Sequence, residues 1–282
     1  MLFDTHIHID NFAKPEPLRV LRDMDANGVD KVGFLAEEPA YYEKDDVKRK
    51  DHNKARLERL MQWGNGAKDR IMPIYFIDPT EPDAKDQVDM ALDAGVIGFK
   101  IICETFYPGD DRAMPVYAHI AECGKSILFH SGILWDWGDN GKYNRPVFWE
   151  CMMQIPKIKF ALAHISWPWC DECLALFGKF AFMTWHPDYR DQKMYIDMTP
   201  GTPIHFRRQV FRMMQSLMAE DEYPLADRLL FGTDQFTNGF DAKGIVAQAE
   251  NDTHLLLKSG FYPEVVEPMM GKNALEFWGI KA

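Results

Sequence analysis

Long hydrophobic runs are missing from this 282-residue sequence. No stretch approaches the roughly eighteen consecutive apolar residues that a membrane-spanning helix needs, so we expect none. The amino terminus lacks the basic segment and apolar run of a signal peptide, and we expect nothing to be removed from it. Runs of like charge are absent too, and the net charge is −11. Because nucleic acids and many membrane surfaces are anionic, neither is an expected partner.

Cysteine is scarce and odd in number, with five residues scattered along the chain. An odd, scattered set suits a reducing compartment better than a disulfide framework, so we expect a cytoplasmic protein. Cys170 and Cys173 have the spacing of a redox pair. No second such pair completes a structural zinc site, and no strand leads directly into this one. We therefore expect two helix residues with one or both buried, and redox chemistry is the alternative.

What the sequence does contain is a regular alternation of short apolar runs and helical segments. The apolar runs cover residues 1–8, 31–36, 71–77, 96–102, 126–130, 158–164, 193–198 and 228–234. The helical segments cover residues 17–26, 47–63, 83–94, 114–123, 146–154, 169–182, 203–218, 242–259 and 263–277. Near-continuous apolar runs of this length are typical of parallel strands buried on both faces.

This alternation predicts an α/β fold, a single (β/α)₈ TIM barrel that occupies residues 1–282 as one domain. An open doubly wound sheet is the alternative. It is less favoured because no glycine-rich dinucleotide turn follows the first run. In the barrel, the loops after the strands build the active face.

Polar residues close several of the predicted strands. His6 and His8 end the first run and share one face of it, because side chains at i and i+2 of a strand point the same way. His130 closes the fifth run, His164 the sixth and Asp234 the eighth. Each has an ordinary alternative, a hydrogen-bonded core histidine or a helix cap. Together they predict a metal site at one mouth of the barrel.

Six segments make the chain similar to a known family. They are DTHIH at 4–8, GFKI at 98–101, LFHSG at 128–132, ALAHI at 161–165, LFGTD at 230–234 and GKNAL at 271–275. In these segments the chain resembles the amidohydrolase superfamily of metal-dependent (β/α)₈ hydrolases. It is most similar to the amidohydrolase-related branch that includes aminocarboxymuconate-semialdehyde decarboxylase.

The resemblance implies roles for the residues at the strand ends. His6, His8, His130 and Asp234 would bind a divalent metal, with His164 beside the reacting water or the substrate oxygen. Asp234 and His164 are thus the expected catalytic pair, since a carboxylate can take a proton from the water and an imidazole can orient it. One zinc ion suits a site rich in imidazole, with manganese or another metal as alternatives.

Lys100 has two alternative roles in this family. In superfamily members with two metals, a lysine at the end of the fourth strand is carboxylated and bridges the ions. Here Ile101 and Ile102 follow Lys100, so the lysine could instead sit inside the strand, near the pocket or paired with an acid.

The segments after the strands are rich in aromatic side chains. They include Phe106, Tyr107, Trp135, Trp137, Trp167, Trp169, Phe236 and Phe240. Trp135 and Trp167 are predicted to line a pocket for a flat substrate, and packing of the loops onto the barrel is the alternative. Arg145 is predicted to anchor a substrate carboxylate, since guanidinium pairs with carboxylate in bidentate fashion. A purely structural role is the alternative, because Arg145 precedes Pro146 at the start of a predicted helix.

Two reactions fit these residues. The first is hydrolysis of a C–N or C–O bond in an amide, lactone or ester through a metal-activated water. The second is non-oxidative decarboxylation of a small aromatic or unsaturated acid, for which a basic residue facing the metal would be favourable evidence. A barrel that binds a ligand without turnover is a third class, against which the intact ligand set argues. The expected partner is a small-molecule substrate, and a homodimer is left open.

Overall fold

The structure is a computed structural model that describes residues 1–11, 13–40, 43–67, 69–135, 138–218 and 224–281. Its strands form one parallel sheet in the order β8-β7-β6-β5-β4-β3-β2-β1-β9. They are β1 (Phe3–His8), β2 (Lys31–Leu35), β3 (Ile71–Phe76), β4 (Gly98–Ile101), β5 (Ser126–Phe129), β6 (Lys159–Leu162), β7 (Lys193–Asp197), β8 (Leu229–Leu230) and β9 (Gln235–Phe236). Every predicted apolar run contains a strand, as expected for runs buried on both faces.

The last run, predicted as one strand over 228–234, contains only the short strand β8, and β9 follows directly after the run. β8 pairs with β7, whereas β9 pairs with β1 at the other edge of the sheet. Between them the backbone still bonds to the first strand, with Thr5 N–H to the Phe231 carbonyl at 3.1 Å and Asp234 N–H to the His6 carbonyl at 2.9 Å. This segment therefore closes the sheet on itself, and the fold is the predicted (β/α)₈ barrel.

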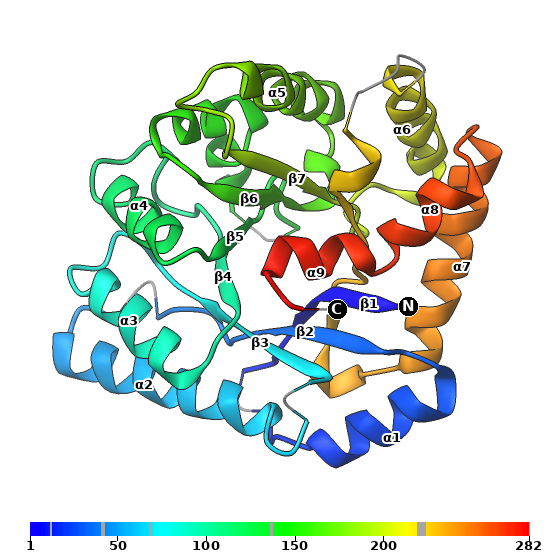
Figure 1. Ribbon diagram of the computed structural model, residues 1–282. Helices are drawn as coiled ribbons and strands as arrows, with labels where there is room; N and C mark the ends of the chain where they lie inside the picture. The colour runs from blue at the N-terminus through cyan, green and yellow to red at the C-terminus, as the bar shows by residue number, and fades with distance from the viewer. Residues whose placement is uncertain (12, 41–42, 68, 136–137, 219–223, 282) are drawn as a thin grey trace.

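Most of the helices surround the sheet on its outer side (Figure 1). They are α1 (Pro17–Asn27), α2 (Asp46–Trp63), α3 (Ala84–Ala94), α4 (Met114–Glu122), α5 (Cys170–Phe182), α6 (Ile204–Leu217), α7 (Ala242–Lys258), α8 (Pro263–Met269) and α9 (Lys272–Trp278). The 3₁₀ helices are η1 (Asn140–Tyr143), η2 (Pro146–Gln154), η3 (Ala163–Ser166), η4 (Met183–Trp185), η5 (Ala226–Arg228) and η6 (Thr237–Gly239). The predicted helix at 146–154 is thus a 3₁₀ helix.

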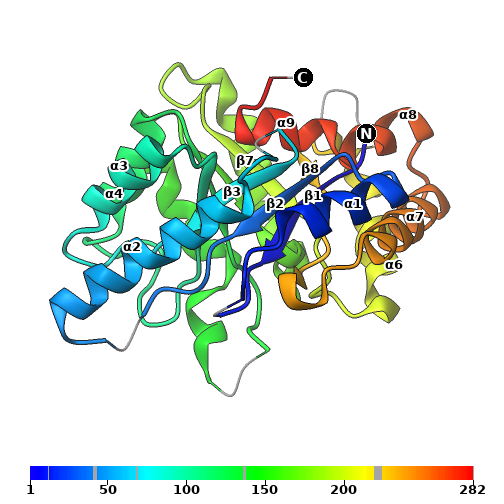
Figure 2. The ribbon, with the colours of Figure 1, turned by 90° about the horizontal axis from the view of Figure 1, so that it is seen from below.

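The predicted final helix at 263–277 is instead divided into α8 and α9. The chain turns at Gly271, which lies so close to β1 that a Cβ atom there would be 2.8 Å from the Met1 carbonyl oxygen. After this turn, α9 crosses the amino end of the barrel, and Figure 2 shows α9 and both termini on that one side of the molecule. Trp278 fills the space beside Gly98, where a Cβ would lie 2.3 Å from the indole ring.

The cysteines in the structure are all free. Cys170 and Cys173 lie buried in α5, where burial raises the pKa of each thiol to about 12. They are therefore buried helix residues, as expected. Because a thiol that is protonated at neutral pH is a poor nucleophile, redox chemistry at this pair is disfavoured. Over the part of the chain that the structure describes, no helix combines the length and apolar character needed to cross a membrane.

Candidate active site

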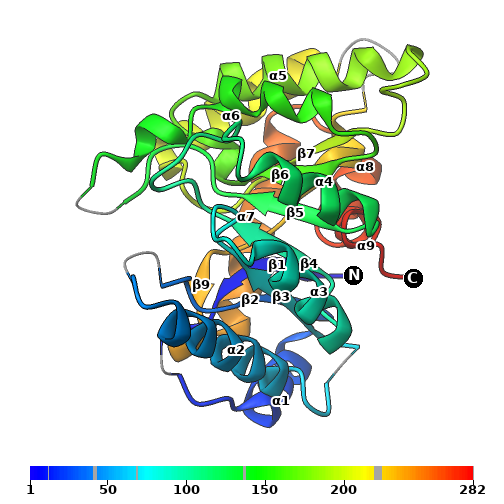
Figure 3. The same cartoon turned by 90° about the vertical axis from the view of Figure 1, so that its left-hand side faces the viewer.

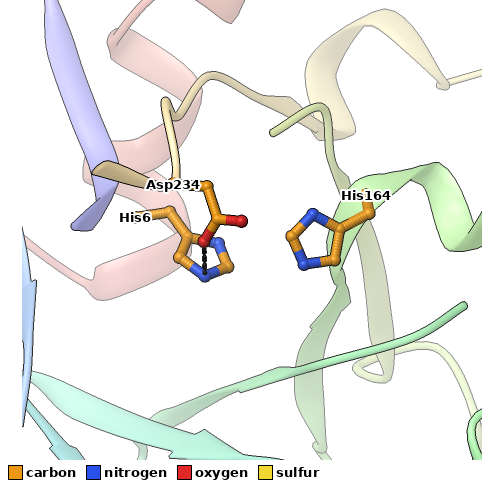
Figure 4. A group of neighbouring side chains, drawn as sticks. All are labelled: His6, His164 and Asp234. Carbon is orange, nitrogen blue, oxygen red and sulfur yellow. Dashed lines mark ion pairs between the residues drawn. The ribbon is translucent and has the colours of Figure 1, made fainter. Parts of the chain in front are cut away.

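The polar residues at the strand ends meet at the carboxyl end of the barrel, opposite α9. We call His6, His8, His130, His164 and Asp234 the mouth cluster. His6 Nε2 lies 3.2 Å from His8 Nε2, and Asp234 Oδ1 lies 3.3 Å from both. The ring centre of His164 is 4.9 Å from that of His130 and 5.5 Å from that of His6. Figure 4 shows that His164 faces His6 and Asp234 across a common space.

Buried hydrogen bonds orient two of these imidazoles. His6 Nδ1 lies 2.6 Å from Asp197 Oδ2, and His164 Nδ1 lies 3.0 Å from Thr199 Oγ1. Because a carboxylate only accepts, His6 donates through Nδ1 and keeps the lone pair of Nε2 for the site. The Thr199 hydroxyl donates to Asp197 and so accepts from His164, which also leaves His164 Nε2 as an acceptor.

The backbone at the site is held in an unusual conformation. His164, Ile165 and Ser166 have φ of 60°, 51° and 56°, and Asp234 has φ of 61°. Residues other than glycine seldom adopt this left-handed region, and such residues cluster at functional sites. The turn at His164 packs tightly against Gly201, where a Cβ would lie 2.6 Å from the His164 Cβ. Glycine at 201 is therefore what lets His164 take its place.

Burial sets the protonation states of the cluster. It lowers the pKa of His6 and His130 well below the usual value and that of His164 to about 4. Burial opposes ionisation of Asp234, but the neighbouring His6 and His8 outweigh it and lower the pKa of this carboxyl. At neutral pH His6, His130 and His164 are thus neutral and Asp234 is ionised. Neutral imidazole and ionised carboxylate are the forms that bind metal ions.

The geometry fits a metal ion. Two ligands bound at about 2.1 Å to one ion lie roughly 3.0–3.4 Å apart, and the distances of 3.2 Å and 3.3 Å among His6, His8 and Asp234 fall in that range. His130 Nε2 is buried without a hydrogen-bond partner among the described residues. A buried polar atom of this kind is costly unless something binds it. His6, His164 and Asp234 also bring ligand atoms within 4.8 Å of one another.

Lys100 belongs to this site. It is completely buried in β4, and its Nζ atom lies 3.4 Å from His6 Nε2. Burial lowers the pKa of the amine to about 8, while the carboxylates of Asp234 and Asp197 act in the opposite direction. Lys100 therefore lies inside strand β4, with its amine next to the mouth cluster, which is one of the two positions considered from the sequence.

The residues predicted to contact substrate differ in their positions. The rings of Trp135 and Trp167 stack at 5.9 Å with an angle of 6°, and Trp167 N–H donates to the His164 carbonyl. Trp135 is 73% exposed, so this pair forms an open aromatic wall next to His164. Arg145 is instead paired with Glu172 at 3.0 Å and lies over the ring of Trp169. Its role as a substrate anchor stays a prediction, and the carboxylate that it contacts in the structure is Glu172.

The other loop aromatics divide between the two predicted uses. Phe106 and Phe240 are buried and pack the loops onto the barrel. Phe236 is exposed and stacks on the ring of His8 at 5.5 Å. A hollow of about 310 Å³ opens beside His8 and Phe236, with Asp10 and Glu38 among its lining residues. Trp137 lies outside the described residues.

The sequence pattern predicts no role for Asp197, which fixes the orientation of His6. Its signal was available, because Asp197 is a single acidic residue at the end of an otherwise apolar run. Asp4 opens the DTHIH segment, and the sequence predicts no separate role for it. It is buried, which raises the pKa of its carboxyl to about 7, and it accepts hydrogen bonds from Thr233 and from the His6 backbone. Asp4 thus ties the first strand to the loop that carries Asp234.

A (β/α)₈ barrel with buried polar residues gathered at its carboxyl end has the architecture of a barrel enzyme. The sequence model of the amidohydrolase family matches residues 3–280, so the chain belongs to the amidohydrolase family. It is therefore an enzyme of that family, and the resemblance inferred from its motifs is confirmed. No curated protein matches the chain.

Solved structures with the same fold include three informative examples. 5-Carboxyvanillate decarboxylase from Sphingomonas paucimobilis is 14% identical with a TM-score of 0.67, over 99% of each chain. Dihydroxybenzoic acid decarboxylase from Polaromonas sp. JS666, with bound manganese and the inhibitor 2-nitroresorcinol, is 14% identical with a TM-score of 0.68, over 100% of this chain and 98% of that one. A probable 2-pyrone-4,6-dicarboxylic acid hydrolase from Acinetobacter baumannii is 11% identical with a TM-score of 0.59, over 99% of each chain.

Proposed function

We propose that the mouth cluster holds one divalent metal ion and that the enzyme hydrolyses a C–N or C–O bond in an amide, lactone or ester of a small molecule. His6, His8, His130 and Asp234 are the ligands in this proposal, and His164 lies beside them. The observation that carries it is the approach of His6, His8 and Asp234 to within 3.3 Å of one another. The unpartnered His130 Nε2 supports the same assignment.

A divalent ion at this position would polarise a substrate carbonyl and lower the pKa of a coordinated water toward neutrality. The protein supplies the groups that move the proton. Asp234, ionised and 31% exposed, accepts the proton of the attacking water and delivers it to the leaving group. His164 Nε2 accepts a hydrogen bond from the water and so orients it toward the substrate. Asp197 holds His6 in one orientation and keeps its Nε2 directed at the site.

Zinc is the metal that we propose first, because neutral imidazoles dominate the ligand set. Manganese is the alternative, since the Polaromonas decarboxylase of the same fold is described with manganese bound. We place Lys100 in the substrate pocket as an amine. A carboxylated Lys100 that bridges two ions is the competing arrangement, and the number of metal ions bound at the mouth cluster separates the two.

Decarboxylation of a small aromatic or unsaturated acid is the second candidate reaction. The specific observation in its favour is Lys100, a buried basic residue whose Nζ faces the mouth cluster at 3.4 Å from His6 Nε2. Such an amine can pair with a substrate carboxylate or deliver a proton to the carbon that loses carbon dioxide. Two of the similar solved structures are decarboxylases of aromatic acids, which supports the same candidate. The aromatic wall of Trp135 and Trp167 suits a flat substrate in either reaction.

One experiment separates these reactions. The purified protein is incubated with lactones, amides and aromatic acids in water labelled with heavy oxygen, and carbon dioxide release is followed in parallel. Hydrolysis places the label in the product, whereas decarboxylation releases carbon dioxide and leaves the product unlabelled. Retention of both bound metal and activity after His6→Ala and Asp234→Asn replacement would overturn the proposed site for both reactions.

We further propose that residues 1–282 act as one domain on a small-molecule substrate, and the homodimer stays a prediction. The free state of all five cysteines supports the proposed location in the reducing cytoplasm.

A further inference from the structure

A second group of metal-binding side chains lies on the outer wall of the barrel, on α3 and α4. Asp89 of α3, His119 of α4 and Cys123 just after α4 bring ligand atoms within 4.8 Å of one another. His119 Nε2 lies 2.7 Å from Asp89 Oδ1. The two helices are neighbours that pack against each other, as Figure 3 shows. From this arrangement we infer a binding site for a borderline-soft divalent cation of the zinc class, held by Asp89, His119 and Cys123.

The local backbone places the two ligands of α4 on one face. Cys123 N–H donates to the His119 carbonyl at 3.0 Å, so helical spacing continues through Cys123. Side chains four residues apart on a helix lie one above the other. An imidazole and a thiol at this spacing therefore reach the same point, and Asp89 meets them from the neighbouring helix. One carboxylate, one imidazole and one thiolate are ordinary zinc ligands, with water completing the tetrahedron.

The surroundings of the thiol favour a cation. Two carboxylates, Asp89 and Glu122, lie close enough to Cys123 to act on it electrostatically. These carboxylates near the sulfur attract a divalent ion, and the thiol proton passes to the buffer as the sulfur–metal bond forms. Because the Asp89 and Cys123 side chains are exposed, the Asp89–His119 pair can open by the roughly 0.6 Å that two ligands on one zinc need.

This site is separate from the mouth cluster. Cys123 comes three residues before Ser126, where β5 begins, whereas His130 follows the last residue of β5. The four residues of β5, at about 3.3 Å each, thus separate the two sites along the barrel axis. Bound metal on α3 and α4 would join two helices of the barrel wall and would take no part in the reaction at the mouth.

Titration of the whole protein with Co(II) tests the inference, because only a thiolate ligand gives a sulfur-to-cobalt charge-transfer band in the near ultraviolet. No cysteine belongs to the mouth cluster, so the band reports on Cys123. We expect the band of wild type to saturate with one thiolate-bound Co(II) per chain, in addition to the ion at the mouth cluster, and His6→Ala to develop the band equally. We expect its loss in Cys123→Ser and in His119→Ala, with Cys151→Ser as a matched control that keeps the band. The activity of Cys123→Ser should equal that of wild type.

Zinc should compete for the band at equimolar concentration and raise the melting temperature of wild type more than that of Cys123→Ser. A wild-type protein without the band, or a band that survives in Cys123→Ser, would overturn the inference. Neither result would bear on the mouth cluster, which His6→Ala tests independently.

Discussion

The two ends of the barrel interior differ in the polarity of their side chains. At the amino end, α9 closes the opening, and Trp278, Phe277 and Leu275 pack with Phe3 and neighbouring apolar side chains into a buried cluster. At the carboxyl end, the interior positions hold imidazoles, carboxylates and an amine, several of them completely buried. Burying polar groups costs free energy unless they are partnered, whereas burying apolar surface stabilises the fold. The apolar amino end therefore stabilises the fold, and the polar carboxyl end holds the groups proposed for the reaction.

The largest effect should come from Asp234→Asn at the mouth. The amide keeps the shape of the side chain but cannot accept the proton of the attacking water. We expect the turnover rate to fall by about 10²–10⁴-fold, with little change in melting temperature. Steady-state kinetics and thermal unfolding of the same preparation check both parts. Activity within a few-fold of wild type would remove Asp234 from the reaction.

The converse change is Trp278→Ala at the amino end. Trp278 is 4% exposed, and truncation of a buried tryptophan costs about 3–5 kcal/mol of unfolding free energy. Activity per folded molecule should stay near that of wild type at low temperature. Denaturant unfolding measures the loss, and Trp185→Ala, at a tryptophan that is 75% exposed, is the matched control. Equal stability of the two variants would contradict the role given to α9.

Gly201→Ala tests how tightly the mouth is built. The added Cβ would lie 2.6 Å from the His164 Cβ, so the imidazole must move. A displacement of about 1 Å in a catalytic group can cost roughly 10²-fold in rate, and we expect a loss of that order. Gly239→Ala is the control, because no atom lies within 4 Å of its added Cβ. A Gly201→Ala enzyme that is as active as the control would show that the reaction tolerates a displacement of the His164 side chain.

Asp197→Asn tests whether the hydrogen bond from His6 to Asp197 contributes to metal binding. The amide can no longer accept a strong hydrogen bond from His6 Nδ1–H in the same geometry. Replacing a carboxylate that orients a metal-binding histidine typically costs about 10–100-fold in metal affinity. Competition with a chelator measures this, and activity at saturating metal should recover most of its value. Unaltered metal affinity would mean that packing alone orients His6.

The smallest effect concerns pH and the amino end. Burial lowers the pKa of Lys159 to about 8, with further lowering by Lys193. The unfolded chain holds this proton up to a higher pH than the folded protein does, so stability should rise between about pH 8 and the ordinary lysine pKa of 10.5. Lys159→Met should remove the part of that rise that comes from Lys159, an effect of less than about 1 kcal/mol for a partly exposed group. The unfolding free energies of wild type and Lys159→Met are measured as a function of pH. The same pH dependence in both proteins would contradict the lowered pKa of Lys159.

Much of the barrel could be predicted from the sequence, because strands buried on both faces are near-continuous apolar runs. The strand-end histidines and Asp234 followed from the same logic. The division of the last helix at Gly271 could not be predicted, since it depends on contact with the Met1 carbonyl oxygen, far away in the chain. The helical pattern at 146–154 was found, but its 3₁₀ form depends on packing rather than on periodicity.

The partners of individual side chains were the least predictable feature. Arg145 resembled a substrate anchor, but its ion pair with Glu172 depends on the placement of two distant segments. Lys100 was ambiguous because following apolar residues can belong either to the strand or to the loop after it. Its partner across the barrel, His6, decides its position. Asp197 was overlooked because one acidic residue at a strand end carries little weight until His6 is seen beside it.

The central claim is that the mouth cluster is built around one metal ion. A crystal structure of the protein grown with zinc or manganese, with anomalous diffraction recorded at the absorption edge of the metal, tests it most directly. We predict one anomalous peak at the mouth, about 2.0–2.3 Å from ligand atoms of His6, His8, His130 and Asp234. Ordered side chains in this arrangement with no peak between them would contradict the claim.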